Sequence, residues 1–92
     1  MSETVRKQLG ERIRMLRNQQ NMSQATFAKM VRIDRGYFVG IEHGKKNPSL
    51  DMLVRIADGF DMDLPTLFCG VVGDRPPEPS GGSTYEYRHI VI

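Results

Sequence analysis

The chain has 92 residues, of which 39% are hydrophobic and 26% charged, and its formal net charge at pH 7 is +2. This length has room for one domain with a single core, and the one cysteine, Cys69, cannot form an internal disulfide. We therefore expect a reduced intracellular protein whose thiol is a small buried hydrophobe. The N-terminus lacks the apolar run of a secretory signal, and no stretch approaches the roughly 18 apolar residues of a membrane span, so the expected location is the cytoplasm.

The charges are unevenly distributed along the chain. Residues 1–46 contain ten basic and four acidic residues, a balance of +6, whereas residues 47–92 contain three arginines and seven carboxylates, a balance of −4. If the charges segregate in space as they do in sequence, the basic half should face a polyanion with the acidic half turned away. Solvated helix faces would show the same bias, so charge alone leaves both interpretations open.

Two helices are predicted first. Apolar residues at helical spacing predict a helix over residues 4–18, and its stripe consists of Val5, Leu9, Ile13 and Leu16. Ser23 is a favoured N-cap for a short second helix over residues 24–31. The residues of this helix that should point inward are Phe27, Ala28 and Val31.

A third short helix follows after only three residues. Asp34 is its expected N-cap, Phe38 and Ile41 form its buried stripe, and Gly44 should end it in the left-handed conformation. Two glycines lie inside this helix, and each should cost roughly 1 kcal/mol relative to alanine. They belong to the face opposite the buried stripe, which consists of Arg35, Gly36, Val39, Gly40 and His43.

Two more helices complete the predicted domain of residues 1–70. Ser49 should cap the fourth helix, whose apolar stripe is Leu50, Leu53, Val54, Ala57 and Phe60. Asp63 should cap a short fifth helix, with Pro65 in its first turn and Gly70 at its end.

The composition then changes. Residues 71–84, which contain D-R-P-P-E-P-S-G-G-S, are predicted to be a linker, and residues 85–92, Y-E-Y-R-H-I-V-I, a β-strand. Because a lone strand cannot satisfy its backbone, we expect pairing with the same strand of a second subunit. Strand addition to another protein and disorder are the alternatives.

Several motifs together resemble one family. They are L-G-E-R-I-R-M-L-R, S-Q with F-A shortly after, I-D-R-G-Y-F, I-E-H-G-K-K-N-P-S-L, I-A and L-P-T-L-F, and they run from Leu9 to Phe68. This pattern, over about two thirds of the chain, resembles the XRE family of Cro- and repressor-type helix-turn-helix regulators, including the controller proteins of restriction-modification systems. The resemblance implies an all-α, five-helix, lambda-repressor-like DNA-binding domain, here followed by the linker and a single strand.

The resemblance also implies that the third helix enters the major groove of double-stranded DNA. The expected base contacts are then Arg35, Gly36, Tyr37, Val39 and Gly40. Arg35 would donate two hydrogen bonds to guanine, and Val39 would touch a thymine methyl group. The two glycines would let the helix backbone approach the bases closely. The alternatives are that they are only tolerated defects, or that this surface serves some contact other than base reading.

Other residues would position the domain on its ligand. The expected phosphate contacts are Ser23, Gln24, His43, Lys45, Lys46 and Asn47. Arg17 and Glu42 occupy positions where the family pairs the first and third helices through an ion pair. Arg32 stands where the family usually has glycine, so a strained left-handed arginine or a locally different turn is expected.

Two function classes follow. The first is a transcriptional regulator, a repressor or autoregulatory controller, that binds a palindromic operator as a homodimer. The second is an antitoxin or adaptor whose strand binds a protein partner. The expected dimer or partner contacts are Leu64, Leu67, Phe68, Tyr85, Tyr87, Ile90 and Ile92. His43, His89 and Cys69 lack metal-ligand spacing, and we find no catalytic pattern, so we expect no enzyme activity, metal or cofactor.

Overall fold

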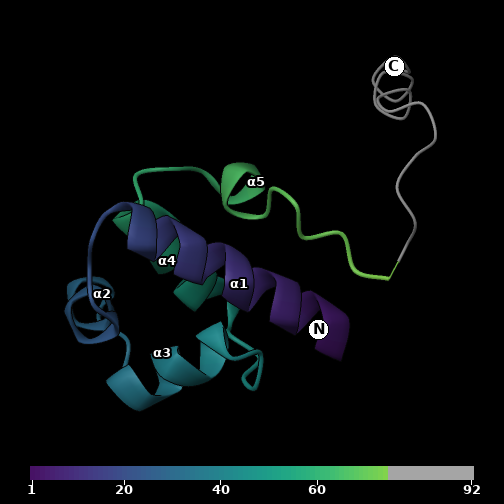
Figure 1. The fold of residues 1–92 in the computed structure, drawn as a ribbon, viewed down its shortest axis with the longest axis horizontal. Helices are drawn as coiled ribbons and strands as arrows, with labels where there is room; N and C mark the ends of the chain where they lie inside the picture. Colours follow the sequence, from purple (N-terminus) through teal and green to yellow (C-terminus); the bar gives the residue numbers. More distant parts are fainter. Residues whose placement is uncertain (75–92) are drawn as a thin grey trace.

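The computed structural model describes residues 1–74, which form five helices joined by short loops (Figure 1). The helices are α1 (Glu3–Gln19), α2 (Gln24–Val31), α3 (Arg35–Glu42), α4 (Leu50–Gly59) and α5 (Leu64–Leu67). Residues 1–74 contain no strand, which confirms the predicted five-helix, all-helical class for this part of the chain. The predicted strand at 85–92 and most of the predicted linker lie outside the described residues.

Each helix begins at a side chain that replaces a missing backbone partner. All four predicted N-caps are confirmed, because each side chain accepts a hydrogen bond from the backbone N–H three residues later. The N-caps are Ser23, Asp34, Ser49 and Asp63. Ser2 caps α1 in the same way, one residue earlier than the predicted start requires.

The first four helices end in the same motif. A residue with positive φ donates its N–H to the carbonyl three residues back, and the next N–H reaches the carbonyl five residues back, which is the Schellman arrangement. The left-handed residues are Asn21, Arg32, Gly44 and Asp61. Gly44 was predicted in this role. Of the two alternatives expected at Arg32, the structure shows the left-handed arginine, with φ 62 and ψ 44.

Three phenylalanines from different helices form the centre of the core. The rings of Phe27 and Phe60 stack with centroids 4.3 Å apart, and the ring of Phe38 lies 5.4 Å from that of Phe27. The inward residues predicted for α2 and α3 are all buried, as are Leu9, Ile13 and Leu16 of α1. Val5 is only half-buried, because it lies near the free end of α1.

The predicted stripe of α4 is partly wrong. Leu50 and Val54 are 67% and 39% exposed, whereas Ile56, which the stripe omitted, is completely buried. The apolar surface of α4 is wider than the face that α2 and α5 cover. The helical period alone therefore did not predict which of the apolar residues of α4 are buried. Leu50 and Val54 therefore form an exposed apolar pair one turn apart.

Two expectations near α5 are also wrong. Leu67 is completely buried in the core, so it has no surface to offer a second chain. Cys69, expected to be buried, is an exposed free thiol. Both errors have the same cause, since α5 is only four residues long and its packing against α4, rather than a repeating pattern, decides which side chains point inward.

Polar side chains of α1 hold the end of the domain. Arg12 donates from Nε and Nη2 to the carbonyl oxygens of Leu67 and Thr66, at 3.2 and 2.8 Å. The Gln8 side-chain amide accepts from the N–H groups of Val72 and Gly73 and donates to the carbonyl of Gly73. The first residues of the expected linker are thus held against α1.

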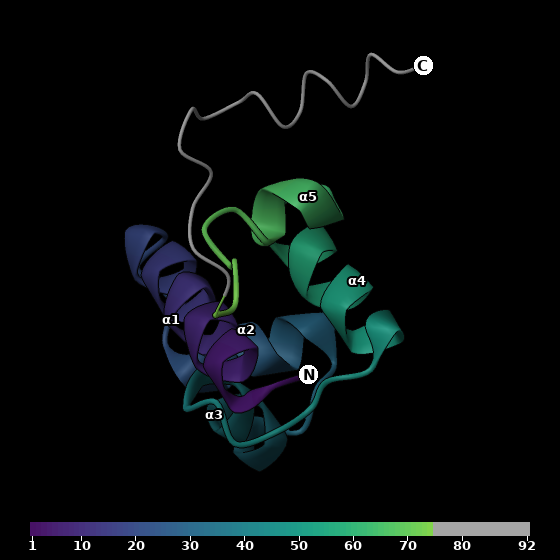
Figure 2. The same cartoon turned by 90° about the vertical axis from the view of Figure 1, so that its right-hand side faces the viewer.

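The helices α3 and α5 lie far apart in the molecule (Figures 1 and 2). Two views at right angles place α5 at the opposite end of the molecule from α3, with α1 between them (Figures 1 and 2). Within residues 1–74, none of the helices has both the length and the apolar character needed to cross a membrane.

Candidate nucleic-acid interface

The helix α3 lies at one end of the molecule and follows α2 after residues 32–34 (Figure 2). Its inner face is buried through Phe38, Ile41 and Glu42. On its outer side Arg35 and Gly36 are exposed, and Val39 is half-buried. The structure therefore brings the expected base-contacting residues onto one short helix, with its N-terminal turn the most accessible part.

The two glycines of α3 have different surroundings. A Cβ atom added at Gly36 would meet only the Asp34 carboxylate, at 3.3 Å, so this part of the helix surface is bare. A Cβ atom added at Gly40 would lie 2.7 Å from Cγ of Lys46. The expectation of a bare surface at both glycines is therefore wrong at Gly40, because a side chain from the following loop covers it.

The expected phosphate contacts fall into two groups. Ser23 and Gln24 lie at the start of α2, where the Ser23 hydroxyl accepts from the Thr26 N–H at 3.0 Å and donates to the Thr26 hydroxyl at 2.9 Å. The second group lies at the end of α3 and in the loop after it. Its members, His43, Lys45, Lys46 and Asn47, are all exposed.

A buried ion pair fixes the orientation of α3. The Arg17 guanidinium donates from Nε and Nη2 to the two carboxylate oxygens of Glu42, at 2.7 and 2.9 Å, and from Nη1 to the carbonyl of Met22 at 2.8 Å. The hydrogen bond to Glu42 raises the pKa of Arg17 despite the opposing effect of burial. Glu42 is only 2% exposed, so these hydrogen bonds offset the cost of burying its carboxylate.

Gln24 joins the same network. Its side-chain Nε2 donates to Oε1 of Glu42 at 2.9 Å, so the first residue of α2 is tied to the last residue of α3. The carboxylate of Glu42 thus links α1, α2 and α3. Sequence reasoning paired Arg17 with Glu42 but missed this third partner, because a contact between residues 24 and 42 depends on the angle between the two helices.

Two basic residues of α1, Lys7 and Arg14, lie beside the end of α3 and were not among the predicted site residues. A small hollow between α1 and the end of α3 is lined by Lys7, Glu11, Arg14, Glu42 and His43. Arg14 lies there with Nε 4.0 Å from a carboxylate oxygen of Glu42. The seven-residue spacing of Lys7 and Arg14, which places both on one side of a helix, was the available signal.

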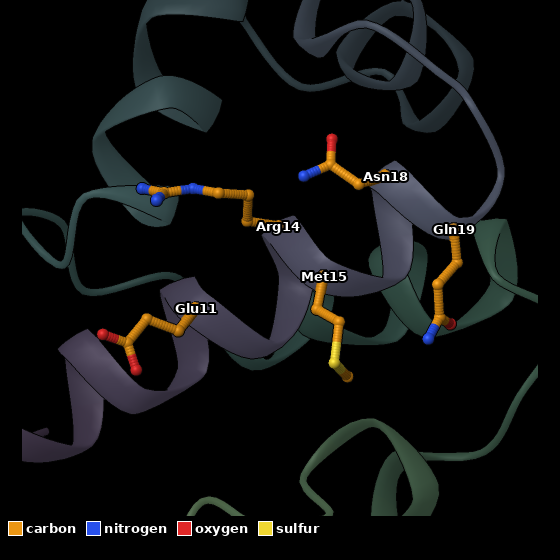
Figure 3. Close-up of a pocket in the computed structure, with 5 residues that line it drawn as sticks. All are labelled: Glu11, Arg14, Met15, Asn18 and Gln19. Atoms are coloured by element: carbon orange, nitrogen blue, oxygen red, sulfur yellow. The ribbon is translucent and has the colours of Figure 1, made fainter.

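A second hollow lies along α1 alone (Figure 3). Arg14 and Asn18 point toward the α2 and α3 side, whereas Met15 points the other way (Figure 3). None of the expected DNA-contacting residues lines this hollow.

Within residues 1–74 no three His, Cys, Asp or Glu side chains gather closely enough to hold a metal ion. The accessible edge of α3 and the two flanking polar groups remain the candidate site.

A family model and curated relatives match most of the described residues. The helix-turn-helix family model HTH_3 matches residues 13–67. The control protein C.MunI of Mycoplasma sp. is 34% identical over 68 residues, which cover 73% of this chain and 92% of that protein. The HTH-type transcriptional regulator RamB of Mycobacterium tuberculosis is 38% identical over 63 residues, 68% of this chain but 13% of RamB.

Solved structures show the same fold. The restriction-modification controller protein C.AhdI from Aeromonas hydrophila shares 35% sequence identity and superposes with a TM-score of 0.66, covering 68% of this chain and 96% of that one. The clp gene regulator ClgR from C. glutamicum superposes with a TM-score of 0.67 at 21% identity, over 73% of this chain and 87% of that one. At that identity, the second similarity bears on the fold alone.

Proposed function

The chain belongs to the XRE-type helix-turn-helix family of DNA-binding transcription regulators, and on this premise we propose that it binds a palindromic operator as a homodimer through α3. The proposed role is that of a repressor or autoregulatory controller. C.MunI and C.AhdI, which resemble this chain over most of their own length, are both named as control proteins.

One observation carries the proposal. The exposed N-terminal turn of α3 is held in a fixed orientation to the start of α2, because Glu42 accepts hydrogen bonds from both Arg17 and Gln24. A helix that reads bases must meet the groove at one angle while its neighbour contacts the backbone. The buried carboxylate supplies that fixed angle.

The side chains of α3 have distinct proposed roles in the major groove. The exposed Arg35 donates two hydrogen bonds to a guanine, and Val39 touches a thymine methyl group. Gly36 brings the helix backbone close to the bases, since a Cβ there would meet little of the protein itself. Tyr37 lies on the flank of α3, where its hydroxyl donates to the carbonyl of Asn47 at 3.3 Å.

The flanking groups would hold the domain on the DNA backbone. The helix start at Ser23 and Gln24 offers free N–H groups and the positive end of a helix dipole to one phosphate. The second proposed phosphate group lies after α3 and consists of His43, Lys45, Lys46 and Asn47. These contacts set the register of the protein without reading sequence.

A dimer would present two copies of α3 to one face of DNA. The half-buried Leu64 of α5 and Phe68 just after it form the proposed contact surface. Because α5 lies opposite α3, a contact there leaves α3 free (Figure 1). Two-fold symmetry would then place the two recognition helices about 34 Å apart, one turn of B-DNA.

The test is a selection of bound sequences from random duplexes, followed by titration of the selected duplex. We expect a two-fold symmetric consensus and an affinity that falls steeply with salt. Arg35→Ala should cost about 1–3 kcal/mol and relax selection at one position in each half-site. No association with any duplex at micromolar protein and low ionic strength would refute DNA binding, and an asymmetric consensus bound by a monomer would refute the dimer.

A further inference from the structure

The Lys46 side chain lies along the outer surface of α3 at Gly40. A Cβ atom built on Gly40 would lie 2.7 Å from Cγ, 3.2 Å from Cε and 3.5 Å from Cδ of Lys46. These contacts follow the lysine stem over most of its length, so the side chain occupies the space that residue 40 leaves empty. No other residue type would leave that space free, because every other residue has a Cβ atom.

Further contacts fix the two ends of this arrangement. The ammonium nitrogen of Lys46 lies 5.4 Å from the centroid of the Tyr37 ring, within the range of a cation–π interaction. The Tyr37 hydroxyl donates to the carbonyl of Asn47, and the Lys45 N–H donates to the carbonyl of Gly40 at 2.8 Å. The residues before and after Lys46 are therefore both hydrogen-bonded to α3.

From these contacts we propose that Gly40 and Tyr37 are positioning residues, which hold the Lys46 ammonium group beside α3 where it contacts a DNA phosphate. The proposal rests on the proposed function, since it deepens the account of the same interface. A free lysine loses much rotamer freedom when it binds, and a lysine already held against the helix loses less. The glycine in the helix interior is then explained by Lys46 rather than by close approach to bases.

The neighbouring Lys45 provides a matched control. It carries the same charge in the same exposed loop, but the three atoms nearest to a Cβ at residue 40 all belong to Lys46. Both lysines are proposed phosphate contacts, so replacing either should reduce the salt dependence of binding. Only the contribution of Lys46 should depend on residue 40.

The test is a pair of double-mutant cycles measured on the selected duplex over a series of salt concentrations. Lys46→Ala should weaken binding roughly three- to tenfold and reduce the slope of log affinity against log salt by about one. Gly40→Ala should weaken binding at least roughly threefold and also reduce the slope, because the added methyl group displaces the lysine stem. In the Lys46→Ala background, Gly40→Ala should change affinity less than about twofold.

The control cycle decides whether the coupling is specific. With Lys45→Ala the effects of Gly40→Ala should simply multiply, because the three atoms nearest to a Cβ at residue 40 all belong to Lys46. Equal effects of Gly40→Ala with and without Lys46, or an unchanged salt slope in Gly40→Ala, would overturn the proposal. If none of the proteins binds DNA, the proposed function fails instead, so the two failures are distinct.

Folding is measured separately for each variant by thermal unfolding. If Gly40→Ala does not fold, Tyr37→Leu replaces it in the cycle, because that change removes the aromatic ring and leaves Gly40 intact. Tyr37→Leu should reduce the salt slope in the presence of Lys46 and leave it unchanged in the Lys46→Ala background. A slope that changes equally in both backgrounds would likewise overturn the proposal.

Discussion

Gly10 lies where α1 crosses the end of α3. A Cβ atom there would lie 2.7 Å from the carbonyl oxygen of Ile41 and closer still to that of Glu42. Both neighbours are backbone atoms, so no side-chain rotation can relieve the overlap. Gly10→Ala therefore has to move the two helices apart by about 1 Å to restore ordinary van der Waals contact.

The cost of this movement has two parts. Overpacking a close contact costs typically about 1–3 kcal/mol. Moving the end of α3 also lengthens the 2.7 and 2.9 Å hydrogen bonds between Arg17 and Glu42, and hydrogen bonds to charged groups contribute about 1.5–3 kcal/mol. The better helix propensity of alanine offsets about 1 kcal/mol. We expect a net loss of about 2–4 kcal/mol.

Urea and thermal unfolding followed by circular dichroism measure this loss. For a domain of this size the loss corresponds to a fall in Tm of roughly 10–25 °C. Gly36→Ala is the matched control, because it makes the same change inside a helix where the new methyl group meets only the Asp34 carboxylate. We expect Gly36→Ala to change the free energy of unfolding by less than about 1 kcal/mol, because the better helix propensity of alanine is opposed by crowding of the Asp34 carboxylate oxygen, which accepts the N-cap hydrogen bond from the Tyr37 N–H.

The contrast between the two variants tests the reasoning directly. If Gly10→Ala lowers stability by less than about 0.5 kcal/mol, the helices are not held together by this backbone contact and the argument is refuted. If Gly36→Ala destabilises the fold as much as Gly10→Ala does, the loss comes from the glycines themselves and not from the crossing.

Three further predictions concern the helix ends and the buried pair. Arg17→Met should lower the free energy of unfolding by about 3–5 kcal/mol, since it leaves the Glu42 charge buried, and replacing both residues by Met should restore most of it, as urea unfolding would show. Arg32→Gly should raise Tm by a few degrees, because glycine adopts the left-handed conformation without strain while its carbonyl still accepts from Arg55; an unchanged or lower Tm would contradict this. Hydrogen bonds from the Thr66 hydroxyl and then from its N–H lower the pKa of Asp63 below its usual 3.8, so this stabilisation is complete above about pH 5 and is lost as the pH falls through the folded-state pKa. Asp63→Asn, which keeps a capping oxygen without a titrating charge, should therefore lose less stability than the natural protein between pH 5 and pH 2 in thermal unfolding, and an equal loss would contradict the assignment.

The sequence by itself determined the helix starts and most of the inward-facing residues. Ser23, Asp34, Ser49 and Asp63 were predicted as N-caps and are confirmed, because a cap involves only a backbone N–H three residues away. Gly44 was predicted as left-handed for the same local reason. Helical period placed Arg35, Gly36, Val39 and Gly40 on one face of α3, whereas their expected role as DNA contacts came from the family resemblance.

Tertiary structure decided what those local elements present to each other. The exposure of Leu50 and the burial of Leu67 depend on which neighbouring helix covers each face. The helical period of the sequence does not predict which helix that is. The placement of Lys46 on Gly40 requires the loop after α3 to fold back, and the tie from Gln24 to Glu42 requires a particular angle between two helices. Local hydrogen bonds join residues three to five positions apart, so the sequence pattern predicts them. The contacts of Lys46 and Gln24 form only when the helices and loops pack together, so the sequence pattern does not predict them.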